Sequence, residues 1–283
     1  MFINFSPSDV QMKVDLDEAI RLASIYGFAG LNLPLEEVAR LADPGVAAAK
    51  VKDANLRWGA FFVPVDFRQD QATYDKDMAE FEKLLPVAAR VGCSLSYTCL
   101  TPGHDELDYD ANYQQHVQRL TPIAQMLAEH DIRFALEFIG PKTLRDSFAH
   151  TFIYTADKML EFCADITPAG AANVGLLVDS YHVYTSAASE QYLNQHLTRD
   201  NVFYVHVNDA RPDRTRDEQM DLERVLPCES GVIDSAAFVR VMRRIGYDGP
   251  VTAEPFDDTL IGADPDQLAQ RIYQSISKML ALA

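Results

Sequence analysis

The stretch Phe134-Ala135-Leu136-Glu137-Phe138-Ile139 decides how this sequence folds, because it is a short apolar run that carries a single acid near its end. A predicted helix, Thr155–Asp165, follows it, and then comes a second apolar run, Val174–Asp179, which also ends on an acid. Another predicted helix, Ser189–Leu197, leads to a third apolar run, Val202–Val207. Short apolar strands that alternate with helices indicate a parallel sheet, because each helix returns the chain to the edge where the next strand begins.

The same alternation extends to both ends of the chain. The predicted strands are Phe2–Phe5, Gly27–Leu33, Trp58–Val65, Ser94–Leu100, Phe134–Ile139, Val174–Asp179, Val202–Val207 and Val251–Glu254. The predicted helices are Asp15–Tyr26, Leu35–Ala54, Tyr74–Val91, Ala111–His130, Thr155–Asp165, Ser189–Leu197, Ser235–Ile245 and Pro265–Leu282. Eight strand–helix units in 283 residues are typical of a (β/α)8 TIM barrel with parallel strands. We therefore predict an α/β fold with one such domain over residues 1–283.

A doubly wound open sheet is the structural alternative. That fold usually carries a glycine-rich phosphate-binding turn after its first strand, whereas Phe2–Phe5 is followed here by Ser6-Pro7-Ser8-Asp9. Two connections are long, Gly140–Thr155 and Asn208–Asp234, and we expect them to be lids or substrate loops.

Composition narrows the classes of function. The net charge is −17, from 25 Lys+Arg and 42 Asp+Glu, so a nucleic-acid backbone would be repelled and no nucleic-acid partner is expected. No run of 18 apolar residues is present, so no membrane span is expected. The N-terminus lacks the features of a signal peptide, and the four scattered cysteines (Cys93, Cys99, Cys163, Cys228) suggest reduced thiols. A cytoplasmic location is the corresponding expectation.

Four successive predicted strands end in a group that can bind a metal: Glu137, Asp179, His206 and Glu254. In a parallel barrel these ends meet on one rim, where catalytic residues gather. Three carboxylates held together there would repel one another, and a divalent cation would relieve that repulsion. Three oxygens and one imidazole nitrogen favour Mn²⁺, Mg²⁺ or Co²⁺, with Mn²⁺ as our first choice, while Zn²⁺ stays open.

Each of these residues taken alone has an ordinary structural explanation. A single acid at the end of a strand caps the next helix or pairs with a nearby arginine in many proteins. The interpretation as a metal site therefore depends on the recurrence of such a group on four consecutive strands.

The motifs around these residues resemble those of the xylose-isomerase-like barrels of the sugar phosphate isomerase/epimerase family, which includes ketose 3-epimerases, inosose isomerases and inosose dehydratases. The stretches that carry the resemblance are Leu136-Glu137-Phe138, Val178-Asp179-Ser180-Tyr181-His182, Val205-His206-Val207-Asn208-Asp209 and Gly246-Tyr247-Asp248-Gly249-Pro250-Val251-Thr252-Ala253-Glu254. The second half of the chain carries these motifs, and the first half matches only in the order of its elements.

The resemblance implies roles for individual residues. Glu137 and Glu254 would bind the metal and act as the acid/base pair, while Asp179 and His206 would be ligands only. His182 would contact the substrate, and Arg211 is the nearest candidate for an arginine that orients it. Some epimerases of this kind carry another acid after the strand-five glutamate, but Gly140–Arg145 holds none.

Two further substrate contacts are expected from position alone. Asn208 lies two residues past His206 and therefore points the same way along the strand. His104 lies in the loop after the fourth strand, on the rim that the four candidate ligands share.

The sequence thus predicts a metal-dependent isomerase or epimerase of a sugar, keto-sugar or cyclitol, acting through an enediolate that the metal would stabilise. The alternatives left open are a dehydratase or lyase that uses the same site, and a barrel that only binds a sugar as a partner subunit. A related barrel cuts DNA at abasic sites, but the acidic charge and the absence of histidines at the ends of the first four strands disfavour that activity. Dimers and tetramers are common in the family that the sequence resembles, so a homo-oligomer is one option, and the sequence does not determine the oligomeric state.

Overall fold

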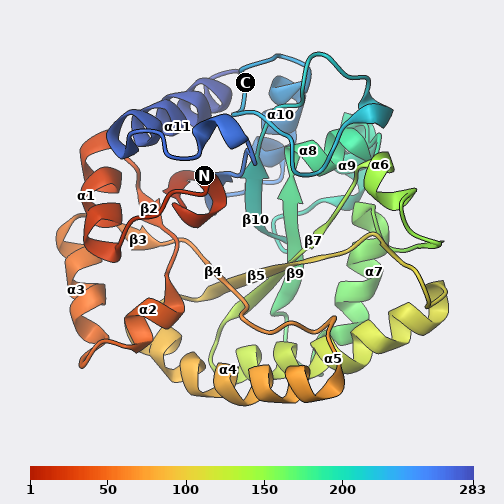
Figure 1. Cartoon of the computed structure of the whole chain (residues 1–283), viewed down its shortest axis with the longest axis horizontal. Coiled ribbons are helices and arrows are strands. Elements are labelled where there is room, and N and C mark those ends of the chain that lie inside the picture. Colours follow the sequence, from red (N-terminus) through yellow and green to blue (C-terminus); the bar gives the residue numbers. More distant parts are fainter.

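In the computed structural model, which describes residues 1–283, nine short strands form one parallel sheet with helices around it (Figure 1). The strands are β1 (Phe2–Phe5), β2 (Gly30–Leu31), β3 (Arg57–Trp58), β4 (Phe61–Phe62), β5 (Leu95–Leu100), β7 (Arg133–Phe138), β9 (Val174–Asp179), β10 (Val202–Val207) and β11 (Pro250–Ala253). They are hydrogen-bonded in the order β3-β2-β1-β11-β10-β9-β7-β5-β4. Because β3 and β4 are the two ends of this order and only Gly59 and Ala60 separate them in the chain, the sheet closes into a barrel.

The strands β3 and β4 are two halves of the predicted third strand, so the barrel has the eight strand positions expected and the predicted fold is confirmed. The break lies where the side chain of Asn4 fills the inside of the barrel. A Cβ atom at Gly59 would lie only 2.2 Å from Asn4 Oδ1, so a residue with a side chain does not fit there. The amide of Ala60 donates to Asn32 Oδ1 at 3.0 Å in place of a sheet hydrogen bond.

The helices around the barrel are α1 (Leu16–Tyr26), α2 (Leu35–Ala39), α3 (Gly45–Asp53), α4 (Gln71–Val91), α5 (Tyr109–Glu129), α7 (Ala156–Ile166), α9 (Glu190–His196), α10 (Ser235–Arg244) and α11 (Pro265–Leu280). Five of them begin at an aspartate whose carboxylate accepts a backbone N–H of the first turn, which satisfies a donor that the helix leaves free: Asp15, Asp70, Asp108, Asp234 and Asp264. None of the helices has the length and the apolar character needed to cross a membrane.

Most predicted boundaries differ from the structure by only a few residues, but the single helix expected over Leu35–Ala54 is wrong. The structure has α2 and α3 there, and Pro44 lies between them as the residue before α3. A proline disfavours the helical conformation of the residue that precedes it, so one continuous helix is interrupted at this point. The last strand also ends at Ala253, one residue earlier than predicted, so Glu254 follows it directly.

The loops at the C-terminal ends of the strands contain short elements that the sequence analysis did not predict. Helix α8 (Ser180–Thr185) begins directly after Asp179. The loop 140–155 contains α6 (Lys142–Arg145) and β8 (His150–Thr151), and β8 pairs with β6 (Gly103–His104) as a separate antiparallel ribbon. Three single 3-10 turns complete the set: η1 (Ser8–Val10), η2 (Arg216–Glu218) and η3 (Asp258–Leu260).

A layer of polar side chains crosses the inside of the barrel. Asn4 Nδ2 donates to Asn32 Oδ1 at 2.9 Å and to Thr252 Oγ1 at 3.0 Å. The hydroxyl of Tyr204 lies 2.8 Å from the same Thr252 oxygen, which joins β10 to this layer. Among the side-chain atoms of these four residues, only Asn4 Oδ1 lacks a hydrogen-bond partner, so the barrel interior accommodates polar atoms close to the rim where the ionisable residues gather.

Candidate metal centre

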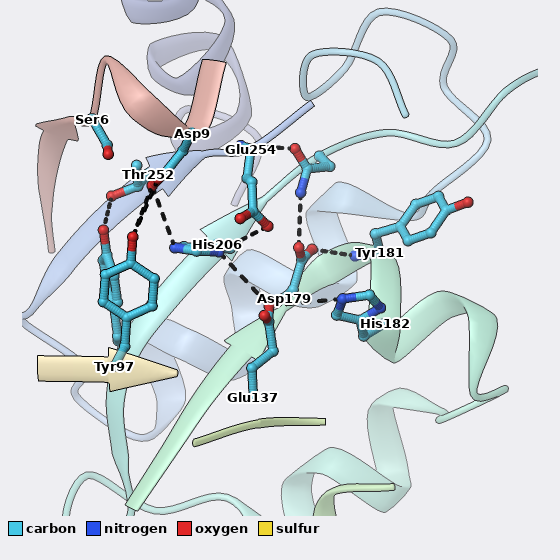
Figure 2. Close-up of polar contacts among 12 residues, drawn as sticks. Ser6, Asp9, Tyr97, Glu137, Asp179, Tyr181, His182, His206, Thr252 and Glu254 are labelled. Atoms are coloured by element: carbon cyan, nitrogen blue, oxygen red, sulfur yellow. Dashed lines mark hydrogen bonds and ion pairs between the residues drawn. The ribbon is translucent and has the colours of Figure 1, made fainter. Parts of the chain in front are cut away.

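Four ionisable side chains converge at the C-terminal end of the barrel. Glu137 comes from β7, Asp179 from β9, His206 from β10, and Glu254 directly follows β11; these strands are consecutive neighbours in the sheet. Asp179 and His206 are register partners. One ligand atom from each of the four lies within 4.8 Å of the others (Figure 2). The sequence prediction that these residues come together therefore agrees with the geometry.

The spacing and the unsatisfied atoms of this cluster fit a divalent cation. His206 Nδ1 lies 3.3 Å from Glu254 Oε2 and 3.7 Å from Glu137 Oε1. Around a cation with bonds of about 2.1 Å, adjacent ligands lie about 3 Å apart and opposite ligands about 4.2 Å apart, so the cluster would need to contract only slightly. Glu137 Oε1 is buried without a hydrogen-bond partner, which leaves it free for such a bond.

The protein alone gives the two glutamates opposite acidities. Burial raises the pKa of Glu137 well above its ordinary value, and the negative charges of Glu254 and Asp179 raise it further. Burial also opposes the ionised form of Glu254, but His206 and the Arg224 guanidinium outweigh it and hold the pKa of Glu254 below its ordinary value. For His206 burial lowers the pKa, yet Glu254 outweighs that effect and leaves the pKa raised.

The arginine that lies against this cluster is Arg224, which the sequence patterns do not predict. Its side chain is only 1% exposed, and its Nη1 donates to Asp179 Oδ2 at 2.9 Å and to Glu254 Oε2 at 3.1 Å. Its Nη2 donates to Asp221 Oδ1 at 2.8 Å. Arg224 lies 18 positions after His206, inside the long loop 208–234, so neither strand periodicity nor proximity in sequence marks it.

Two of the predicted substrate contacts, His182 and Asn208, lie directly against the cluster. The amide of Gly140 donates to His182 Nδ1 at 3.2 Å, and His182 Nε2 lies 3.8 Å from Glu137 Oε1 (Figure 2). Asn208 Nδ2 donates to Asp179 Oδ2 at 2.8 Å, and Asn208 Oδ1 accepts the Glu254 amide at 2.9 Å. Both polar atoms of the Asn208 side chain therefore hold a candidate ligand in place, which is a positioning role.

Comparison with known proteins assigns the family. The model of the xylose isomerase-like TIM barrel family matches residues 20–279, which is most of the chain. The chain belongs to this family.

Among curated relatives, the inosose isomerase of Bacillus velezensis is 23% identical over 190 residues, which is 66% of this chain and 62% of that protein. The chain therefore matches less than two thirds of the length of this relative. Among solved structures, a xylose isomerase domain protein from Alicyclobacillus acidocaldarius has a TM-score of 0.86 and 26% identity, with 100% of this chain and 99% of that chain covered.

Two solved structures with lower sequence identity share the fold. The IOLI protein, solved with a zinc atom, has a TM-score of 0.82 and 17% identity and covers 99% of this chain and 98% of its own. A D-psicose 3-epimerase solved in the presence of D-fructose has a TM-score of 0.75 and 17% identity, with both chains covered completely.

The other two predicted substrate contacts of this xylose isomerase-like barrel lie away from the four ligands. Arg211 is partly exposed and its Nε lies 3.5 Å from Asp213 Oδ1, so Arg224 and not Arg211 is the arginine in the cluster. His104 is in β6, and its Nδ1 accepts the amides of Glu106 and Leu107 at 3.0 and 2.9 Å. The side chain of His104 lines a separate cavity.

A second missed residue is Asp9, which lies in η1 just after the first strand. It is 8% exposed, and burial together with the charge of Glu254 raises its pKa to about 6. The hydroxyl of Tyr97 donates to Asp9 Oδ1 at 3.2 Å, and Asp9 Oδ2 lies 4.0 Å from His206 Nε2 (Figure 2). Asp9 therefore lies on the side of the His206 ring that points away from the ligand cluster, but no hydrogen bond joins the two residues, because His206 Nε2 has no partner.

Proposed function

We propose that this protein is a divalent-metal-dependent isomerase or epimerase of a sugar, keto-sugar or cyclitol. The observation that carries this proposal is the convergence of Glu137, Asp179, His206 and Glu254 within 4.8 Å at the catalytic end of the barrel. The names of the relatives support it: an inosose isomerase, a D-psicose 3-epimerase, and the IOLI protein with its zinc atom.

The four converging residues would hold one cation, and their three carboxylates favour Mn²⁺, with Mg²⁺, Co²⁺ or Zn²⁺ as other occupants. When bound, the cation would polarise a substrate carbonyl and make the neighbouring C–H group more acidic.

Glu137 and Glu254 are the acid/base pair of this proposal, because both belong to the cluster that would hold the cation. His206 and Arg224 hold the pKa of Glu254 below its ordinary value, so its carboxylate is the group that accepts the proton from the substrate carbon. Glu137 would return a proton to the neighbouring carbon or to the opposite face of the same carbon. Return to the neighbouring carbon gives isomerisation, and return to the opposite face gives epimerisation.

Exchange of substrate hydrogen with solvent tests the proposal. Purified protein dialysed against Mn²⁺ is incubated in D2O with a panel of ketoses and inososes, and deuterium at carbon is followed by NMR. We expect exchange with at least one substrate, and a decrease of about 100-fold or more in Glu254→Gln, which keeps the shape of the side chain but removes the base. Glu223→Gln is the matched control, since Glu223 is an exposed carboxylate that pairs with Arg214.

Metal content is measured in the same preparations by plasma mass spectrometry. Wild type is expected to hold about one divalent ion per chain, and His206→Ala is expected to lose it. A wild-type protein that holds no divalent ion even after dialysis against Mn²⁺, Mg²⁺, Co²⁺ and Zn²⁺, or a metal-loaded protein that exchanges no substrate hydrogen, would contradict the proposed function. Loss of a hydroxyl from the substrate as water would instead identify a dehydratase at the same site.

A further inference from the structure

A second cavity, of about 440 Å³, opens at the same end of the barrel. It is bounded by the chain that follows the C-terminal end of β5, by the first turns of α5, and by Phe148 from the loop 140–155. Phe148 is its one hydrophobic lining residue; the polar ones include Arg68, Thr101, His104, Asn112, Gln115 and His116. None of the four candidate metal ligands lines it, and the proposed chemistry does not use it.

Two residues that line this cavity each carry a buried hydrogen-bond acceptor without a partner in the protein. Asn112 is 2% exposed and His116 is 8% exposed, and neither Asn112 Oδ1 nor His116 Nε2 makes a hydrogen bond. His116 Nδ1 lies 2.9 Å from the Asn112 carbonyl oxygen, which only accepts, so the ring proton is on Nδ1 and Nε2 is an acceptor. Burial also lowers the pKa of His116 to about 4, so the ring stays neutral near pH 7. Buried acceptors without donors are rare in folded proteins, so this pair points to a ligand that donates hydrogen bonds.

The charges around the cavity disfavour an anion. Asp105 and Glu106 both line it, against Arg68 as the one lining residue with a permanent positive charge. The guanidinium of Arg68 already donates two hydrogen bonds within the protein: Nε donates to Thr101 Oγ1 at 3.0 Å, and Nη2 donates to the Cys99 carbonyl oxygen. A hydroxyl group suits both acceptors and carries no charge, whereas a phosphate or carboxylate would offer no donor to them.

Arg68 connects the cavity to the candidate metal centre. Its Nη2 donates to the carbonyl oxygen of Cys99, which is the register partner of Glu137 on the neighbouring strand. Adjacent parallel strands lie about 4.8 Å apart, so the strand that binds Arg68 lies next to the strand that carries Glu137. We infer that this cavity binds the hydroxyls of a neutral, unphosphorylated polyol, and, as a deepening that rests on the proposed function, that it takes the end of the substrate remote from the reacting carbons.

The imidazole of His116 reports directly on this binding. Long-range ¹H–¹⁵N spectra of the seven histidines are recorded while sorbitol, sorbitol 6-phosphate or inorganic phosphate is added to the full-length protein. We expect sorbitol to move the His116 Nε2 signal upfield in a saturable way, because a nitrogen that begins to accept a hydrogen bond becomes more shielded. Sorbitol 6-phosphate is expected to bind at least about tenfold more weakly, since its charge meets Asp105 and Glu106.

The variant Asn112→Leu keeps the size of the side chain and removes the second acceptor. It is expected to weaken sorbitol binding by about three- to tenfold, which corresponds to one lost hydrogen bond. Gln114→Leu, on the exposed part of the same helix, is the matched control and should bind sorbitol like wild type. If Asn112→Leu does not fold, the movement of the His116 Nε2 signal in wild type during the sorbitol titration tests the inference by itself.

No movement of the His116 signal with sorbitol, or movement with phosphate instead, would overturn the inference. The titration requires no catalysis, so this failure is distinguishable from the absence of solvent exchange that would contradict the proposed function.

Discussion

At the scale of single residues, the least expected feature is a buried arginine among the candidate metal ligands. Arg224 donates to Asp179 and Glu254, and with His206 it balances part of the negative charge that the three carboxylates concentrate there. A buried charge that loses its partner is costly, so Arg224 stabilises the protein as long as no cation occupies the cluster. The same positive charge opposes the entry of a cation.

Replacing Arg224 with methionine separates these two effects. Without metal, in EDTA, we expect Arg224→Met to lose about 3–5 kcal/mol of stability and its melting temperature to fall by about 6 °C or more, because the carboxylates lose their partner. Addition of Mn²⁺ should raise the melting temperature of the variant more than that of wild type, since no guanidinium repels the cation.

The matched control is Arg211→Met, which changes the partly exposed arginine that pairs with Asp213. It should melt like wild type with and without Mn²⁺. If the two variants behave alike, then the position of Arg224 has no energetic importance for the cluster.

At the scale of elements, the loop 208–234 determines whether Arg224 reaches the cluster. Asp209 is fully buried and its Oδ1 accepts the amides of Ala210 and Ile233, both at 2.9 Å. Its Oδ2 accepts the amides of Ser230 at 3.1 Å and Gly231 at 2.7 Å. One carboxylate next to the end of β10 thus ties down the far end of the loop, and the loop is expected to be ordered by this residue more than by its own composition.

The substitution Asp209→Asn tests that expectation, because it keeps the size of the side chain and replaces one acceptor oxygen with an NH2 group that faces backbone donors. We expect trypsin to cut after the loop arginines about tenfold faster or more, in line with the loss of hydrogen bonds to a charged acceptor. Solvent exchange into the substrate should slow while bound metal is retained, because Arg224 moves and the four ligands do not.

Asp213→Asn, an exposed carboxylate in the same loop, serves as the control and should resist trypsin like wild type. Equal cleavage of the two variants would show that Asp209 does not hold the loop.

At the scale of the whole molecule, stability against acid depends on opposing contributions. Protonation relieves the self-repulsion of a chain with net charge −17, and carboxyls with a raised pKa such as Glu137 are also favoured in the folded state as the pH falls. His116 acts in the other direction. Burial lowers its pKa from 6.5 to about 4. Between these two pH values the imidazole is mostly protonated in the unfolded chain and mostly neutral in the folded chain.

The contribution of His116 is therefore present near pH 7 and is lost as the pH falls from 6.5 toward 4. Between pH 7 and pH 5 this linkage costs about 2 kcal/mol of the free energy of unfolding. We expect His116→Gln, which does not titrate, to lose about that much less stability than wild type over this interval in urea unfolding. The control His150→Gln replaces an exposed histidine and should follow the wild-type pH dependence; parallel curves for His116→Gln and wild type would contradict the prediction.

Much of the architecture was predictable because it depends on local pattern. Short apolar runs such as Val174–Asp179 and Val202–Val207 have the bounds predicted for them, since a buried strand needs a continuous apolar segment and little else. Two elements differ from the prediction for reasons that lie close to them in the structure. Pro44 divides one predicted helix. The side chain of Asn4 leaves room only for glycine at position 59, where the third strand is broken. The first signal is visible in the sequence, whereas the second requires knowing which residues meet inside the barrel.

The sequence by itself determined the parallel barrel and the convergence of Glu137, Asp179, His206 and Glu254, because parallel strands that pair in order must bring their C-terminal ends to one rim. Only the tertiary structure decided that Arg224, and not Arg211, lies among the candidate ligands, and that His104 lines a separate cavity. Those side chains come from loops, and no repeating pattern fixes where a loop places its residues. Their positions follow from contacts such as Asp209 with Ile233, which are 24 residues apart in the chain and therefore not predicted by any local pattern.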